Sequence, residues 1–120
     1  MPDSAGPGRT LKVETRDEGR ARVLKVVGQL TETEAPQFLE MLKRETSAGR
    51  ARVVLDMDGI EYMSSAGLGA LVSVHPTFIG SGVRFILAGT NPKVRKLLAL
   101  TSLDKLIESA ETVPEAISRP

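Results

Sequence analysis

The stretch from Val53 to Leu71, VVLDMDGIEYMSSAGLGAL, decides the fold because it joins a strand pattern to a helix pattern. Residues 53–56 are a continuous, mostly apolar run, which predicts a strand covered on both faces. From there the apolar spacing becomes helical, at Leu68, Leu71, Val72 and His75. Ser64 or Ser65 therefore falls at the helix N-cap, beside unpaired backbone N–H groups and the positive end of the helix dipole. A phosphate is well tolerated at such a position.

The segments before this stretch predict an antiparallel hairpin and a helix. Short β-type runs at residues 11–14 and 21–27 flank a turn that contains Asp17 and Gly19. A loop is expected over residues 28–33, in which Thr31 or Thr33 caps the helix. The apolar positions of that helix keep a period near 3.6, at Ala35, Phe38, Leu39 and Leu42.

The segments after the stretch predict further strands and helices. Residues 83–88 form a buried strand, and strand, helix and strand in succession imply a parallel βαβ unit. Asn91 caps a helix with Pro92 at its first position, residues 103–107 supply a short edge strand, and Thr112 caps a last helix over 113–118. The expected fold is one α/β domain over residues 11–118, an open mixed sheet of four or five strands packed by about four helices. A disordered tail is expected over residues 1–10.

Composition narrows the functional classes. The 120 residues carry 16 Lys and Arg against 15 Asp and Glu, with both signs mixed along the chain. Direct nucleic-acid binding is not expected, because affinity for phosphate backbones needs clustered cations. The absence of cysteine excludes thiol catalysis and disulfides. No apolar run approaches the ~20 residues that span a bilayer and no secretory signal pattern is present, so a cytoplasmic location is expected.

A hydroxyl at a strand-to-helix turn also raises the question of nucleophilic catalysis. A hydrolase elbow needs glycine where Met63 stands, and the only histidine, His75, lies roughly 15 Å along the same helix at ~1.5 Å per residue. Neither the Rossmann nor the P-loop glycine pattern is complete. Asp56, Asp58 and Glu61 could bind a divalent cation, but strand-end carboxylates more often cap or face solvent. We therefore expect no enzymatic activity, no metal and no cofactor.

The helix face opposite the apolar stripe is expected to be small and flat. It comprises Ala66, Gly67, Ala70, Ser73 and Thr77. The loops after the strands at 21–27 and 83–88 are expected nearby, because ligands and partners of such sheets gather at the carboxyl ends of the strands. These features predict a surface on which a partner protein docks closely. Simple N-capping is the alternative role for Ser64 and Ser65.

Motifs along the chain resemble those of the STAS-domain anti-sigma-factor antagonists. The phosphorylation loop of that family is similar to Ser64-Ser65-Ala66-Gly67-Leu68-Gly69, approached by Ile60-Glu61-Tyr62-Met63. Other matching motifs are Gly28-Gln29-Leu30, Val83 to Ala88 after Gly82, Asn91-Pro92-Lys93-Val94-Arg95 and Leu100-Thr101-Ser102-Leu103. The resemblance covers roughly residues 11–117 and implies the STAS fold.

The resemblance also implies a function. In this family the unphosphorylated domain binds a serine-kinase anti-sigma factor of the GHKL ATPase fold and frees a sigma factor; the kinase then phosphorylates the antagonist, and a metal-dependent serine phosphatase restores it. The implied phosphoacceptor is Ser65. The implied partner-binding residues are Thr31, Ser64, Ala66, Gly67, Leu68, Ala70 and Asn91. The free chain is expected to be a monomer or weak dimer.

The chain departs from the family pattern at three positions. Ser64 and Thr31 stand where Asp is common, and Ala66 replaces a second hydroxyl. Two acidic groups are therefore lost, whereas the hydroxyl of Ser65 is kept. Two other functions remain open: a partner-binding module of a transporter or multi-protein sensor assembly without a phosphorylation switch, and a small nucleotide-binding domain.

Overall fold

The computed structural model describes residues 11–120, so the tail expected over residues 1–10 lies outside the described residues. The strands are β1 (Leu11–Glu18), β2 (Ala21–Leu30), β3 (Arg52–Met63), β4 (Arg84–Ala88) and β5 (Glu108–Ala110). The helices are α1 (Ala35–Glu45), α2 (Ser65–Ser81), α3 (Pro92–Leu100), α4 (Leu103–Leu106) and α5 (Val113–Ser118).

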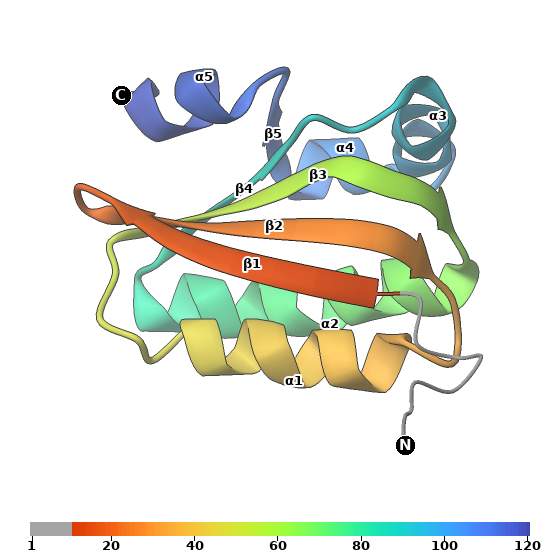
Figure 1. The fold of residues 1–120 in the computed structure, drawn as a ribbon, viewed down its shortest axis with the longest axis horizontal. Helices are drawn as coiled ribbons and strands as arrows, with labels where there is room; N and C mark the ends of the chain where they lie inside the picture. The colour runs from red at the N-terminus through yellow and green to blue at the C-terminus, as the bar shows by residue number, and fades with distance from the viewer. Residues whose placement is uncertain (1–10) are drawn as a thin grey trace.

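One mixed sheet organises the chain, with the strands in the order β1-β2-β3-β4-β5. β1 pairs antiparallel with β2, and the other neighbours pair in parallel, which confirms the predicted hairpin and βαβ unit. Helices α1 and α2 cover one face, while α3, α4 and α5 lie on the other side (Figure 1). A large core packs against α1 and α2. A smaller core under α5 comprises Val23, Val54, Ile86, Ala88, Ala110 and Ala116.

β3 runs on to Met63, well beyond residue 56 where the predicted strand ends, because two irregularities disrupt its alternation of buried side chains. Against β2, the register shifts between Lys25 and Val27 and again between Gly28 and Gln29, each time leaving an extra residue on β3. From Met57 onward the buried side chains of β3 are consequently three residues apart, at Met57, Ile60 and Met63. A strand with this spacing lacks the alternation that identifies a strand in sequence. The predicted strand therefore ends too early, and the motif Ile60-Glu61-Tyr62-Met63 that precedes the serine pair belongs to β3.

β2 also runs further than expected, to Leu30, and changes how α1 begins. The helix has Glu34 at its N-cap position, with no side-chain capping bond, so the expected cap by Thr31 or Thr33 is wrong. Instead, the Glu34 carboxylate accepts hydrogen bonds from the backbone N–H and the hydroxyl of Thr31. In a capping box, a glutamate side chain accepts a hydrogen bond from the backbone N–H three residues before it. Glu34 makes this bond with Thr31 and so closes the turn between β2 and α1.

The edge strand expected over residues 103–107 is also wrong, since this segment is helical as α4 and β5 follows it. Leu103 and Ile107 are both buried and four residues apart, which suits one turn of helix. Ser102 precedes the helix with a φ of 61°.

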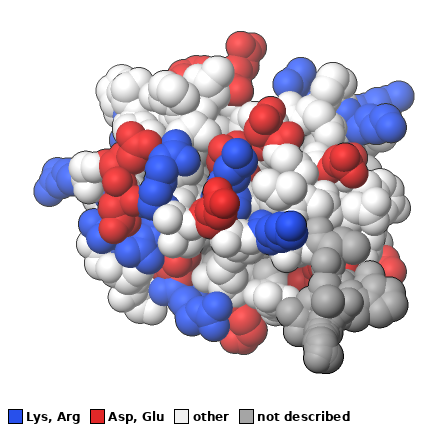
Figure 2. All heavy atoms as spheres, viewed as in Figure 1, with Lys and Arg blue, Asp and Glu red and all other residues white. Residues whose placement is uncertain are grey.

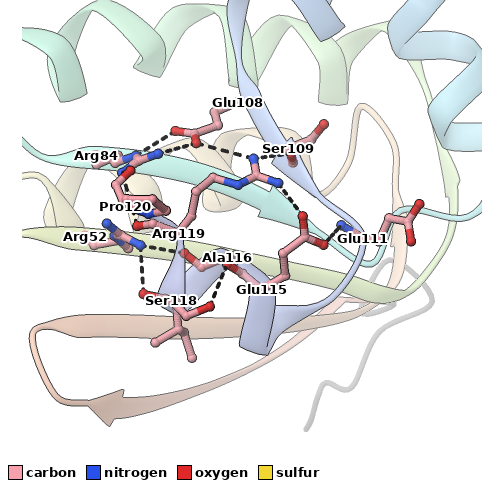
Figure 3. A network of polar contacts seen from close by, with 11 residues as sticks. Arg52, Arg84, Glu108, Ser109, Glu111, Glu115, Ala116, Ser118, Arg119 and Pro120 are labelled. Atoms are coloured by element: carbon pink, nitrogen blue, oxygen red, sulfur yellow. Dashed lines mark hydrogen bonds and ion pairs between the residues drawn. The ribbon is translucent and has the colours of Figure 1, made fainter.

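The C-terminal segment is held against three adjacent strands by a polar network (Figure 3). On β3, Nη1 of Arg52 donates to the carbonyls of Ala116 and Ile117, at 2.7 and 2.8 Å. On β4, Arg84 forms an ion pair with Glu108 of β5. Arg119 bridges the carboxylates of Glu108 and Glu115. The predicted α5 therefore forms, capped by Thr112 as expected, and is tied directly to the sheet.

The surface carries both signs of charge. Figure 2 shows acidic and basic side chains interspersed over the face it displays, as the mixed sequence predicts. Within residues 11–120, none of the helices is both long and apolar enough to cross a membrane.

Candidate functional site

Ser64 is the N-cap of α2, which resolves the choice between the two serines. Its backbone is extended, with φ −90° and ψ 177°, and its side-chain oxygen accepts a hydrogen bond from Ala66 N–H at 3.2 Å. Its own N–H donates to the Leu30 carbonyl at 2.9 Å, which fastens the start of α2 to the end of β2. Ser64 is buried, at 9% exposure.

Ser65 occupies the first helical position of α2 and is exposed. Within the described residues its hydroxyl makes no hydrogen bond, because Ser64 supplies the cap. The hydroxyl therefore stands free in solvent at the positive end of a 17-residue helix. An added anion at this position would face orphan backbone N–H groups instead of displacing a structural contact.

An open groove of about 430 Å³ lies beside Ser65, between the start of α2 and one face of α3. The end of β3 and the start of α2 supply Glu61, Tyr62, Met63, Ser64, Ser65 and Leu68, and α3 with the residue after it supplies Lys93, Val94, Leu97 and Thr101. The groove walls are mainly apolar. Two side chains of opposite charge, Glu61 and Lys93, reach it from opposite walls, so the site combines an apolar floor, a free hydroxyl and a mixed charged rim.

Three of the predicted partner-binding residues are buried. Gly67, Leu68 and Ala70 are all buried, whereas Val72 is 43% exposed. The expected apolar stripe is therefore wrong at Val72, and the expected small open face is wrong at Gly67 and Ala70. α2 packs against both α1 and the sheet, which gives it a broad inward face rather than a narrow stripe. Leu68 still lines the groove, and Ala66 is half-buried beside it. Gly67 and Ala70 do not line it.

Thr31 and Asn91 are both engaged in structural contacts. Thr31 is half-buried and bonded to Glu34 as described above. Asn91 caps α3 as predicted, accepting from Val94 N–H at 2.8 Å, while its Nδ2 donates to the Ile60 carbonyl at 2.9 Å. Asn91 therefore fixes α3 against β3, which sets the position of the groove's second wall.

The residues that sequence reasoning missed lie on α3. Lys93, Leu97 and Thr101 are spaced by four and so share one helix face. That spacing is visible in the sequence but does not by itself show what the face contacts. Only the contact between α3 and the end of β3 shows that this face looks onto Ser65.

The carboxylates considered for a cation have other roles. Asp56 is buried and accepts a hydrogen bond from Asp58 N–H at 3.1 Å, which stabilises the first irregularity of β3. Asp58 and Glu61 are exposed. Residues 11–120 contain no cluster of three acidic or histidine side chains placed to hold a metal ion.

An open five-stranded sheet with a capped helix after its central strand defines the class of fold, and comparison with known proteins identifies the family. Residues 12–116 match the model of the STAS domain family. The chain therefore belongs to the STAS domain family. A Thermotoga maritima protein assigned as an anti-sigma factor antagonist is 32% identical over 69 residues, which cover 58% of this chain and 61% of that relative. The match thus spans about three fifths of the relative's length.

Other relatives align over most of their length. The anti-sigma-B factor antagonist of Staphylococcus aureus is 24% identical over 101 residues, 84% of this chain and 94% of that protein. Among solved structures, an anti-sigma factor antagonist from Mycobacterium paratuberculosis superposes with a TM-score of 0.83 at 21% identity, covering 94% and 95% of the two chains. The Bacillus protein SpoIIAA in its phosphorylated form gives 0.67 at 20% identity, covering 91% and 97%. These likenesses show the shared fold.

Proposed function

We propose that this chain is an anti-sigma factor antagonist that binds its partner through the groove beside Ser65. The names of the relatives indicate the class of partner, which is an anti-sigma factor. The site supplies the surface, because the groove offers apolar walls at Met63, Leu68 and Leu97 with exposed Tyr62 at its edge. Tyrosine is among the residue types that dominate the binding free energy of protein interfaces, and surrounding apolar contacts exclude water from it.

The proposed partner is a serine-kinase anti-sigma factor of the GHKL ATPase fold, and the proposed switch is phosphorylation of Ser65 by that kinase. One observation carries the switch: Ser65 is exposed and free, while the neighbouring Ser64 alone caps the helix. A phosphate on Ser65 adds about −1.5 to −2 charge at a helix N-terminus that accommodates it. The fold would survive phosphorylation, whereas a complex that buries Ser65 would have to desolvate the new charge.

A serine phosphatase would reverse the modification, as the family resemblance implies. Sigma factors act in the bacterial cytoplasm, so the proposal places the chain there. Ser64 and Thr31, in place of the usual Asp residues, leave the loop without acidic groups at these two positions. We infer that recognition by the kinase relies on the groove walls and Glu61, not on carboxylates inside the loop. The chain itself is proposed to act by binding, without catalytic turnover.

The test is a binding titration of Ser65→Ala, Ser65→Glu and Ser64→Ala with the cognate kinase, alongside phosphosite mapping. Ser65→Ala should bind and resist release by ATP. Ser65→Glu should fold normally and bind about 100-fold more weakly, which corresponds to ~3 kcal/mol. Leu97→Ala, which shortens a groove wall, should weaken binding without removing the phosphate site.

Two outcomes would contradict the switch. Ser65 would be excluded as the acceptor if the phosphate mapped to Ser64, or if none of residues 63–67 carried a phosphate. Tight binding by Ser65→Glu would favour the alternative function, a constitutive partner-binding module of a transporter or sensor assembly. If Ser65→Glu binds tightly but Leu97→Ala folds normally and does not bind, the groove would still be the partner-binding surface.

A further inference from the structure

Among the strands of residues 11–120, β1 lies at the edge of the sheet and pairs on one side alone. It pairs only with β2 among the described strands, and from Lys12 to Glu18 its residues are exposed. Glu18 pairs with Ala21 across a two-residue turn, and the closing pair of such a hairpin exchanges hydrogen bonds. Antiparallel pairs alternate, so the N–H and C=O groups of Val13, Thr15 and Asp17 point outward, to the free edge. An unpaired edge of this kind is a template for another strand.

The two faces of β1 differ in chemistry. Leu11, Val13 and Thr15 face α1, where with Phe38 and Met41 they line a hollow of about 250 Å³. The side chains of the opposite face alternate in charge along the strand. They are Lys12, Glu14, Arg16 and Glu18.

We propose that two copies of this chain pair through β1, antiparallel, about a two-fold axis at Thr15. In this register Glu14 lies opposite Arg16 of the second copy, and Lys12 lies opposite Glu18 of the second copy. Symmetry makes each contact twice. All four charged positions on this face then meet an opposite charge, and they do so in the non-hydrogen-bonded pairs, where side chains approach most closely.

The neighbouring registers fail on charge. A shift that centres the axis on Glu14 places Glu14 against itself and Lys12 against Arg16. A shift toward the turn places Arg16 against itself and Glu14 against Glu18. Like charges directly opposite are destabilising. Axes at Val13 or Asp17 also oppose unlike charges, but they pair only two of the four charged positions within β1, whereas the axis at Thr15 pairs all four. Such self-complementarity is what an isologous two-fold interface requires.

The remaining contacts of the interface are compatible with this pairing. Val13, which is 36% exposed, would lie opposite Asp17 of the second copy, whose carboxylate already accepts hydrogen bonds from Arg22 and Arg50 of its own chain. Arg16 already donates to Glu18 of its own chain through Nε at 2.6 Å, which leaves its terminal nitrogens for Glu14 of the second copy. No residue of the groove beside Ser65 belongs to β1. The dimer would therefore present two open grooves, and its existence does not depend on the proposed phosphorylation switch.

Charge variants of the full chain test the pairing by sedimentation equilibrium, from about 1 μM to about 1 mM, the range of weak to moderate dissociation constants. The parent should dimerise. Glu14→Arg and Arg16→Glu should each weaken self-association about 10-fold or more, because each converts two attractive pairs into repulsive ones. An equimolar mixture of the two variants should recover dimers, since positions 14 and 16 would both be arginine in one chain and would face glutamate at both positions in the other. A Glu40→Arg variant on the exposed side of α1 should behave like the parent.

Cysteine trapping tests the register, because the parent chain has no cysteine. Thr15→Cys should form a disulfide-linked dimer, since Cα atoms of a hydrogen-bonded pair lie about 5.5 Å apart, within disulfide range. Glu14→Cys should not link, because positions two residues out of register lie about 7–8 Å apart. A parent that stays monomeric to about 1 mM, linkage through Glu14→Cys, or variant mixtures that fail to associate would each overturn the proposal.

Discussion

At the scale of single residues, the two adjacent serines at the start of α2 have different physical roles. Ser64 accepts the capping hydrogen bond and Ser65 does not. Ser64→Ala should lower the free energy of unfolding by about 1 kcal/mol, the usual cost of a lost N-cap. Ser65→Ala should leave stability nearly unchanged. Urea denaturation of both variants measures the difference, and equal losses would contradict the assigned cap.

Gly67 illustrates how burial changes a prediction made from sequence. An added Cβ would lie 2.9 Å from both the side chain and the carbonyl oxygen of Leu30, and 2.9 Å from Met63. The sequence placed Gly67 on a small open face and among the partner-binding residues, which puts binding before folding as its role. In the structure, the missing side chain of Gly67 lets the end of β2 pack directly against α2. A larger residue at this position should therefore impair folding before it impairs binding.

Gly67→Ala should therefore destabilise the fold by about 1–3 kcal/mol, the range for overpacked core sites. Gly69→Ala is the matched control, since it lies in the same helix with nothing within 4 Å of the added Cβ. That variant should be stabilised by about 0.5–1 kcal/mol, as expected for replacing glycine within a helix. Thermal melts of the pair distinguish steric exclusion from helix propensity, and stabilisation of both variants would contradict the burial of Gly67.

At the scale of elements, α5 depends on contacts to the sheet, because a six-residue helix is too short to be stable alone. Arg52 contributes by donating to two carbonyls at the end of that helix. Arg52→Met keeps the aliphatic stem and removes the donors, so it should cost about 1–2 kcal/mol.

In the Arg52→Met variant, amide hydrogen exchange should become faster in residues 113–118, which form α5. Lys105→Met provides a control, since Lys105 is exposed and makes no ion pair within residues 11–120. If exchange in α5 is unchanged in Arg52→Met, the helix is held mainly by Ala116 and the apolar contacts of the smaller core.

At the scale of the whole molecule, the same network links stability to pH. The hydrogen bond from Arg84 lowers the pKa of Glu108, and that from Arg119 lowers the pKa of Glu115, both from 4.5. A carboxylate whose pKa is lower in the folded state contributes stability above its unfolded pKa and loses it as the pH falls through the folded value. Stability should therefore decline below about pH 4.5.

Glu108→Gln should flatten that decline between about pH 5 and pH 3, the range in which glutamates titrate. Glu40→Gln should leave the profile unchanged, since Glu40 is exposed and lies outside the network. Chemical denaturation at several pH values supplies both profiles. A Glu108→Gln profile that parallels the parent would show that other carboxylates control acid unfolding.

Several features were predictable because they depend on local chemistry. The hairpin followed from its turn residues, and the caps at Asn91 and Thr112 followed from polar side chains placed before helical periods. The cap of α2 was predicted to lie within the serine pair, and the structure assigns it to Ser64. The exposed hydroxyl at a strand-to-helix junction, which is the centre of the proposed site, was visible in the same way. Such signals involve residues within about four positions of one another, so they survive in a single sequence.

The sequence by itself determined the fold class, the position of the serine pair and the family resemblance. Only the tertiary structure decided the length of β3, the inward face of α2 and the groove beside Ser65. β3 pairs with β2 through two irregularities that break its alternation, and α2 is buried from two sides at once. The groove arises where α3 is fastened to Ile60 by Asn91, a contact between residues 31 positions apart. Each of these depends on which distant surfaces meet, and periodicity along one segment carries no information about its neighbours in space.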